Sequence, residues 1–269
     1  MINLHLLRKL IFLSNVARAF DPLGFKCPFV VRAKMIVQKM CIENSDWDEE
    51  VSERVQTIAR QWLKECNELN NLRIERCLLK GGEDNYCELH VFSDASEKAY
   101  GSVIYVRERT TEGIRVTLAM AKSKIAPIKI ISVPRLELMA AWIGVKISIT
   151  VATALKIEKR RIKYWTDSED VLHWLNKHSG TLKPFVANRV SQIQQLSTLD
   201  QWRYVSTKEN TADILSRGLD LQRSAEWERW FSGPRFLYDE EGSWPNWKRK
   251  TSVLEKEVKK GYAFCDSLR

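Results

Sequence analysis

Three consecutive segments with the pattern of β-strands are the feature that most constrains the fold of this 269-residue chain. They are rich in Val, Ile and Tyr and read ELHVFSD (88–94), AYGSVIYVRER (99–109) and IRVTLAMA (114–121). The connections between them are short and polar or contain glycine, which is typical of antiparallel strands. The segment PRLELMAAWIGVKISITVATAL (134–155) follows, and Pro134 suits the start of a helix. The sequence therefore predicts an antiparallel meander followed by one long helix.

Strand and helix patterns alternate in the rest of this region. Strands are predicted at 161–167 (RIKYWTD) and 201–206 (QWRYVS). Helices are predicted at 168–178, 184–196 and 210–218, and Gly218 closes the last of them. Three strands, a helix, a strand, two helices, a strand and a helix together predict an α/β fold with a mixed sheet.

The chain before the first strand has helical periodicity. Apolar residues recur at helical spacing in VVRAKMIVQKM (30–40), and Pro22 with Gly24 marks a break before that segment. A second helix is predicted over 46–69, with Asp46 as its N-cap and acidic residues in its first turn. The segment KGGEDN (80–85) is rich in turn-forming residues. We therefore predict a domain boundary there.

Four acidic residues occupy separate settings in these elements: Asp94 and Asp167 at the ends of predicted strands, Glu137 one turn into the long helix, and Asp213 at the start of the last helix. If the two strands are parallel neighbours, Asp94 and Asp167 emerge at one sheet edge, where ligands of α/β folds tend to bind. Two Mg²⁺ ions roughly 4 Å apart can drive phosphodiester hydrolysis, and such ions need a cluster of carboxylates. For each acid alone the alternative is a turn or helix-capping role. The combination predicts a two-metal nuclease site.

Charge and cysteine content limit the class of partner and the compartment. Lys and Arg outnumber Asp and Glu by 43 to 34, a net charge of +9, which favours a polyanionic partner. The six cysteines have no CxxC spacing, so we expect free thiols in an intracellular setting, with nucleus and cytoplasm both open. Zinc binding by Cys77, Cys87 and His90 is a weaker alternative. The longest apolar segment, 136–155, contains charged residues and is interpreted as a helix with a buried face, so no membrane partner is expected.

Several motifs resemble, in the right order, the ribonuclease H domain of retrotransposon polyproteins. These are SDAS with YGSVIY, PRLELMAA, YWTDSEDVLHWL, and NTAD with ILSRG. The segments LSNVARAFDPLGFKCPFVVRAKMIVQKM and WERWFSGPRFL narrow the resemblance to the BEL/Pao group of long-terminal-repeat elements, over roughly residues 8 to 247. The resemblance implies a ribonuclease H-like α/β fold, with a five-stranded mixed sheet flanked by helices and preceded by a mostly helical segment. It also implies three regions: 1–82, similar to the thumb or connection of a reverse transcriptase; 86–219, ribonuclease H-like; and 220–269, an extension toward integrase.

The activity that the resemblance implies is hydrolysis of the RNA strand of RNA–DNA hybrids with two Mg²⁺ or Mn²⁺ ions. Asp94, Glu137, Asp167 and Asp213 match the family's metal-binding carboxylates. The family pattern would have Asp94 bridge both ions, Glu137 hold the ion nearer the leaving group, and Asp213 hold the ion that activates water. The implied partners are the hybrid and other parts of the polyprotein.

The sequence departs from the family pattern in the stretch before the last aspartate, which reads VSTKENTAD and lacks the usual histidine. We therefore expect slow turnover. Ser93, Ser96 and Ser168 lie beside the proposed ligands and are candidate contacts to 2′-hydroxyl groups, with turn or capping roles as the alternative. Four basic residues are candidate phosphate contacts, with a role as solvated surface charges as the alternative: Lys177, Lys183, Arg189 and Arg203.

Motifs that the sequence lacks limit the other activities. No YxDD-type turn occurs, so the chain is not a polymerase by itself, and we expect either a fragment of a larger polyprotein or a degenerate genomic copy of one. The family region is also known as a Pao retrotransposon peptidase, but the Asp-Thr-Gly or Asp-Ser-Gly loop of an aspartic protease is missing, because Glu169 follows Asp167 and Ser168. The alternative to an enzyme is a non-catalytic nucleic-acid-binding or scaffold fragment.

Overall fold

A five-stranded mixed sheet forms the centre of the protein in the computed structural model, which describes residues 8–43, 47, 49–69, 74, 77–81, 86–246 and 257–259. The strands are β1 (Cys87–Ala95), β2 (Ala99–Thr110), β3 (Gly113–Ile125), β4 (Ile162–Thr166) and β5 (Trp202–Tyr204). Their order across the sheet is β3-β2-β1-β4-β5. The first three strands pair antiparallel, and β1 with β4 and β4 with β5 pair parallel. The meander and the mixed sheet are therefore confirmed.

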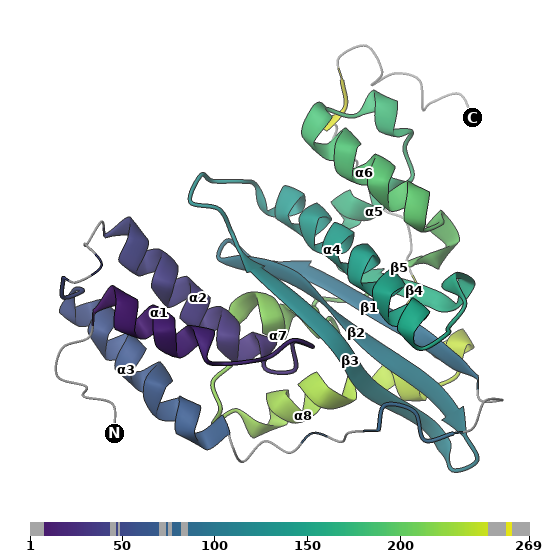
Figure 1. The fold of residues 1–269 in the computed structure, drawn as a ribbon. Helices are drawn as coiled ribbons and strands as arrows, with labels where there is room; N and C mark the ends of the chain where they lie inside the picture. The colour runs from purple at the N-terminus through teal and green to yellow at the C-terminus, as the bar shows by residue number, and fades with distance from the viewer. Residues whose placement is uncertain are drawn as a thin grey trace.

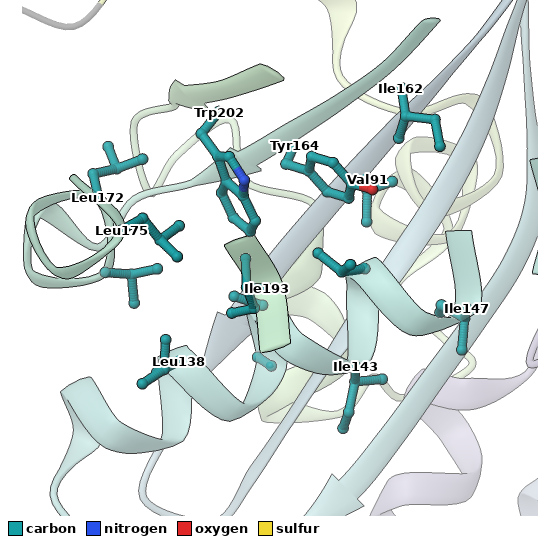
Figure 2. Close-up of a cluster of buried hydrophobic side chains, with 14 of the residues drawn as sticks. Val91, Leu138, Ile143, Ile147, Ile162, Tyr164, Leu172, Leu175, Ile193 and Trp202 are labelled. Atoms are coloured by element: carbon teal, nitrogen blue, oxygen red, sulfur yellow. The ribbon is translucent and has the colours of Figure 1, made fainter. Parts of the chain in front are cut away.

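One face of the sheet is covered by α4 (Val133–Ala154), α5 (Glu169–Leu175) and α6 (Pro184–Leu196) (Figure 1). Figure 2 shows apolar side chains of these helices meeting those of the strands, among them Val91, Tyr164 and Trp202. The rings of Tyr164 and Trp202 stack with their centroids 4.8 Å apart. Since β1 and β4 alternate their side chains, every second residue faces this core.

The other face of the sheet is covered by residues from both ends of the chain (Figure 1). The helices on this side are α1 (Lys9–Ala17), α2 (Cys27–Ile42), α3 (Glu53–Glu68), α7 (Ala212–Arg217) and α8 (Ser224–Ser232). Trp230 of α8 donates its indole N–H to Phe25 O, and its own carbonyl accepts a hydrogen bond from the Tyr105 hydroxyl of β2. Arg107 of β2 donates to Leu237 O at 2.7 Å. The N-terminal helices, the sheet and the segment after α7 therefore share one hydrophobic core.

The helices predicted from the sequence all occur, and one of them begins later than expected. The helix expected over 46–69 begins at Glu53, with Ser52 in the N-cap position, while Asp46 itself lies outside the described residues. The reason is tertiary: Glu50 forms an isolated β-bridge with Arg8, and the side chain of Val51 is buried, so the chain is extended here. Gly218 closes α7 with φ of 82°, as the sequence predicts.

The helix α4 is the one helix, within the described residues, that is long and apolar enough to cross a membrane by length and composition. In this structure it is a core helix that packs on β1 and β2. The domain boundaries near residues 82 and 219 stay predictions.

Candidate functional site

Two of the predicted carboxylates lie side by side at one edge of the sheet. In the parallel pairing of β1 with β4, Ser93 stands opposite Thr166, so Asp94 and Asp167 are the next residues on the two strands. Alternation along β1 places Asp94 on the same face as Phe92, which belongs to the core beside α7. The expectation that parallel strands bring Asp94 and Asp167 to one edge is therefore confirmed.

The short helix α7 brings Asp213 and Ser216 to this edge. It packs closely on β2 at Gly101, where an added Cβ would lie 2.7 Å from Leu215 Cδ2 and 2.2 Å from Lys122 O. Ser216, on the inner side of α7, donates a short hydrogen bond to Asp94 Oδ2. Asp213 accepts a hydrogen bond from Arg217 Nε at 2.5 Å, one turn later in the same helix.

Glu137 reaches the edge from the opposite face of the sheet. Its helix, α4, lies close to the strands at Gly144, where an added Cβ would lie 2.9 Å from both Ser102 Oγ and Val91 Cγ1. Ser102 also donates a hydrogen bond to Ala140 O at 2.7 Å. Glu137 Oε2 accepts a 2.5 Å hydrogen bond from Ser168 Oγ. The site therefore straddles the sheet edge, with α7 on one face and α4 on the other.

Asn210 connects the last loop to both strands and was not identified from the sequence. Its amide donates to Ser93 O at 3.0 Å and to Asp167 Oδ1 at 2.9 Å. Its side-chain oxygen accepts from the N–H of Ala212, the residue two positions on, as asparagine does in turns. Asparagine directly before a helix is the sequence signal that could have identified this turn, but the contact with Asp167 depends on packing.

Two carboxylates of the site, Asp94 and Glu137, have a raised pKa. Burial raises the pKa of Asp94 to about 7, and the charges of Asp167, Asp213 and Glu137 act in the same direction. The hydrogen bond from Ser216 opposes this shift. Burial also raises the pKa of Glu137 to about 7, with the charge of Asp167 adding to it and the hydrogen bond from Ser168 opposing it. A buried acid and a half-buried acid that share a negatively charged edge are stabilised by a cation, or by protonation where no cation is bound.

The donor set of this edge fits a hard divalent cation in kind, because it consists of carboxylate oxygens. In the part of the chain that the structure describes, however, no group of three or more His, Cys, Asp or Glu side chains is arranged to hold a metal ion. Each of the four carboxylates instead accepts a hydrogen bond from a protein donor, namely Ser216, Ser168, Asn210 or Arg217. Each carboxylate of this edge therefore has a hydrogen-bond donor of the protein as its partner.

The three serines proposed as substrate contacts each have a partner within the protein. Ser93 is buried and donates to Trp165 O, and Ser96 donates to Ser216 O and accepts N–H groups in the β1–β2 turn. Ser168 is the N-cap of α5. Turn and capping roles therefore occur for Ser96 and Ser168, and contact of the three serines with substrate stays a prediction.

The other residues singled out from the sequence lie away from this edge or have protein partners. Cys87 belongs to the core under α4, whereas the ring of His90 stacks with Trp165 on the opposite face, so the zinc alternative finds no support. Arg203 pairs with Glu241 at 2.5 Å, and Arg189 lies over the ring of Phe185.

Comparison with known families gives a match over residues 8–168 to the model of the Pao retrotransposon-like RNaseH-like domain. The chain belongs to this family. The matched range of this Pao retrotransposon-like RNaseH-like domain includes α1–α3 as well as β1–β4, and three of the four carboxylates, Asp94, Glu137 and Asp167. Asp213 lies beyond it. Comparison with curated proteins gives no match.

Three solved structures are similar to parts of this chain at low sequence identity. The N-terminal RNase H domain of a Mycobacterium tuberculosis protein, solved as a fusion with maltose-binding protein, is 17% identical over 48% of this chain and 95% of its own, with a TM-score of 0.31. RNase H1 from the archaeon Halobacterium salinarum is 14% identical over 48% of this chain and 92% of its own, also with a TM-score of 0.31. A foamy viral protease-reverse transcriptase in complex with dsDNA is 14% identical over 74% of this chain and 38% of its own, with a TM-score of 0.24. The order of the five-stranded sheet and the family match show that the Pao domain has a ribonuclease H-like fold.

Proposed function

We propose that this domain hydrolyses the RNA strand of RNA–DNA hybrids with two divalent ions, Mg²⁺ or Mn²⁺. The observation that carries the proposal is the position of Asp94, which is buried at the sheet edge beside Asp167 and is acted on by the charges of three other carboxylates. A structural role alone does not require four acids to meet at one edge, because their mutual repulsion destabilises the folded state.

The proposal assigns the four carboxylates as metal ligands. Two such ions neutralise charge at the attacking and departing oxygens of an in-line displacement. Asp94 lies at the centre of the cluster, with Asp167 on the neighbouring strand and with Glu137 and Asp213 on the helices at either face. To bind an ion, Asp213 must give up its ion pair with Arg217. Because the Arg217 side chain is 67% exposed, losing this pair costs little free energy.

Three hydrogen-bond donors are assigned as positioning residues. Ser216, Ser168 and Asn210 each hold one oxygen of a carboxylate and leave the other oxygen to a ligand. Groups that orient ligands in this way commonly affect metal affinity without contacting the metal.

A second candidate is a non-catalytic nucleic-acid-binding or scaffold domain of a polyprotein. The observation that favours it is that, among the described residues, no three acids are arranged to hold a metal ion. The net charge of +9 fits a polyanionic partner in both cases.

The test is cleavage of a labelled RNA–DNA hybrid by the purified chain in Mg²⁺ or Mn²⁺, compared with Asp94→Asn and Asp167→Asn. Asp200→Asn is the matched control, because Asp200 is exposed at the start of a short 3₁₀ turn. The proposal expects product from wild type and control, and loss of product in both site variants, because each lacks the charge of one metal ligand. Hybrid binding in EDTA without cleavage in either metal would instead support the second candidate.

A further inference from the structure

The segment 257–259 docks on the loop before α6. Lys183 N–H donates to Glu257 O at 2.8 Å, and Lys259 N–H donates to Thr181 O at 2.9 Å. Between them Leu182 and Val258 form an antiparallel bridge. The Val258 side chain is 7% exposed and belongs to the core that α4, α5 and α6 share. The backbone hydrogen bonds and Val258 therefore hold this segment in place without the side chain of Glu257.

The Glu257 carboxylate is held by the guanidinium of Arg135. Arg135 Nε and Nη2 donate to Glu257 Oε1 and Oε2, both at 3.0 Å, so the pairing is bidentate. Arg135 lies in the first turn of α4, two residues before Glu137 of the proposed site. Its guanidinium also lies 5.2 Å from the ring centroid of Phe185, and Arg189 lies 4.1 Å from the same centroid. The pair therefore joins a docked segment to the start of α4, and Arg189 of α6 lies over the same ring of Phe185.

The stretch of chain on which Glu257 docks is basic. The stretch 177–189 contains Lys177, Lys183 and Arg189 and no Asp or Glu. The guanidinium fork can bind a phosphate as well as a carboxylate, because both offer two oxygens that accept its parallel N–H groups. Glu257 thus supplies from within the chain the geometry that a backbone phosphate of a nucleic acid would supply from outside.

We propose that Arg135 is a phosphate contact for the RNA–DNA hybrid and that Glu257 occupies it as an internal phosphate mimic that restrains binding. The inference rests on the proposed function for the identity of the ligand, but it does not require cleavage. Arg135 is 32% and Glu257 14% exposed, and an ion pair open to solvent on one side exchanges readily. The carboxylate can turn away while the backbone bridge and Val258 keep the segment docked.

The test is fluorescence anisotropy of a labelled hybrid with the full chain in EDTA over a range of salt concentrations. Glu257→Gln keeps the size of the side chain and removes its charge. It is expected to tighten binding roughly three- to tenfold at low salt and to steepen the salt dependence by about one unit of slope, since one more phosphate is neutralised. In the E257Q/R135Q double variant this gain is expected to disappear.

Glu240→Gln is the matched control, because it makes the same charge change and breaks an exposed Arg–Glu pair, that of Arg109 with Glu240. Equal affinities and slopes for E257Q and E240Q would overturn the proposal, and so would a gain that persists in the double variant. A circular-dichroism melt of each variant checks the fold. Because no metal is present, a failure of the cleavage function leaves this result intact and is detected separately as lack of product in Mg²⁺.

Discussion

Asn210 Nδ2 lies 2.9 Å from Asp167 Oδ1 and donates a hydrogen bond to it. The same amide group donates to the carbonyl of Ser93, next to Asp94. One side chain from the loop before α7 therefore ties together the ends of β1 and β4, from which two of the four carboxylates emerge. The loop lacks a histidine, and an asparagine makes the contact with the site.

Replacing Asn210 by Ala is expected to raise the Mg²⁺ concentration needed for cleavage. Without the amide, Asp167 loses its orienting partner, and such losses commonly cost about 10–100-fold in metal affinity or activity. The measurement is a titration of the cleavage rate with Mg²⁺. Asn15→Ala is the control, since the Asn15 amide donates to Ile11 O within α1, away from the site. An unchanged Mg²⁺ dependence in a folded Asn210→Ala variant would contradict the assignment.

Replacing Ser216 by Ala is expected to move the acid limb of the pH–rate profile to higher pH. The hydrogen bond from Ser216 lowers the pKa of Asp94 against the larger effect of burial, so its loss raises that pKa further. The shift should be roughly one pH unit, because one hydrogen bond to a charged group is removed. Ser232→Ala, on the exposed side of α8, serves as the control. Overlapping profiles for Ser216→Ala and wild type would rule out this role.

Much of the architecture could be predicted because its signals are local. The alternation of apolar residues predicts β1 to β4, and the order of elements predicts that Asp94 and Asp167 share an edge. The start of α3 could not be predicted, since the bridge between Arg8 and Glu50 keeps the chain extended up to Ser52. Local sequence does not encode such contacts between distant segments.

The donors of the site could not be predicted for the same reason. Asn210 is 43 residues from Asp167, and Ser216 is 122 residues from Asp94. The cover on the second face of the sheet is another case, because Arg107 and Leu237 meet across 130 residues. The carboxylates are identified by their own chemistry, whereas the side chains that hold them are ordinary Asn and Ser residues until the chain has folded.

The unfolding free energy of the metal-free protein is expected to fall as pH rises from about 4 to about 7. The pKa of Asp94 is raised from its ordinary 3.8 to about 7, so the folded chain keeps a proton that the unfolded chain has lost in this range. Because the folded state binds one more proton than the unfolded state, the free energy of unfolding falls as pH rises. The fall levels off above the pKa of the folded state. The expected loss between about pH 5 and about pH 8 is on the order of 2–3 kcal/mol for this group.

Urea denaturation in EDTA at these two pH values measures that loss. Asp94→Asn removes one titrating group and is expected to reduce the difference to the part that Glu137 contributes, since the pKa of Glu137 is also raised to about 7. Asp200→Asn, an exposed aspartate, should retain the whole difference. A pH difference of the same size in Asp94→Asn and wild type would show that other groups cause it.

Replacing Gly144 by Ala is expected to destabilise the protein, although alanine is the better helix former. The intrinsic gain is about 1 kcal/mol, but the new Cβ would lie 2.9 Å from Val91 Cγ1 and Ser102 Oγ, and overpacking of this kind typically costs about 1–3 kcal/mol. Because α4 must move away from the sheet to admit the methyl group, Glu137 moves with it, and cleavage should fall as well. Gly242→Ala is the matched control, since an added Cβ there meets nothing within 4 Å. Urea denaturation of both variants measures the change in the free energy of unfolding. A Gly144→Ala protein at least as stable as wild type would mean that the close packing of α4 does not fix the position of Glu137.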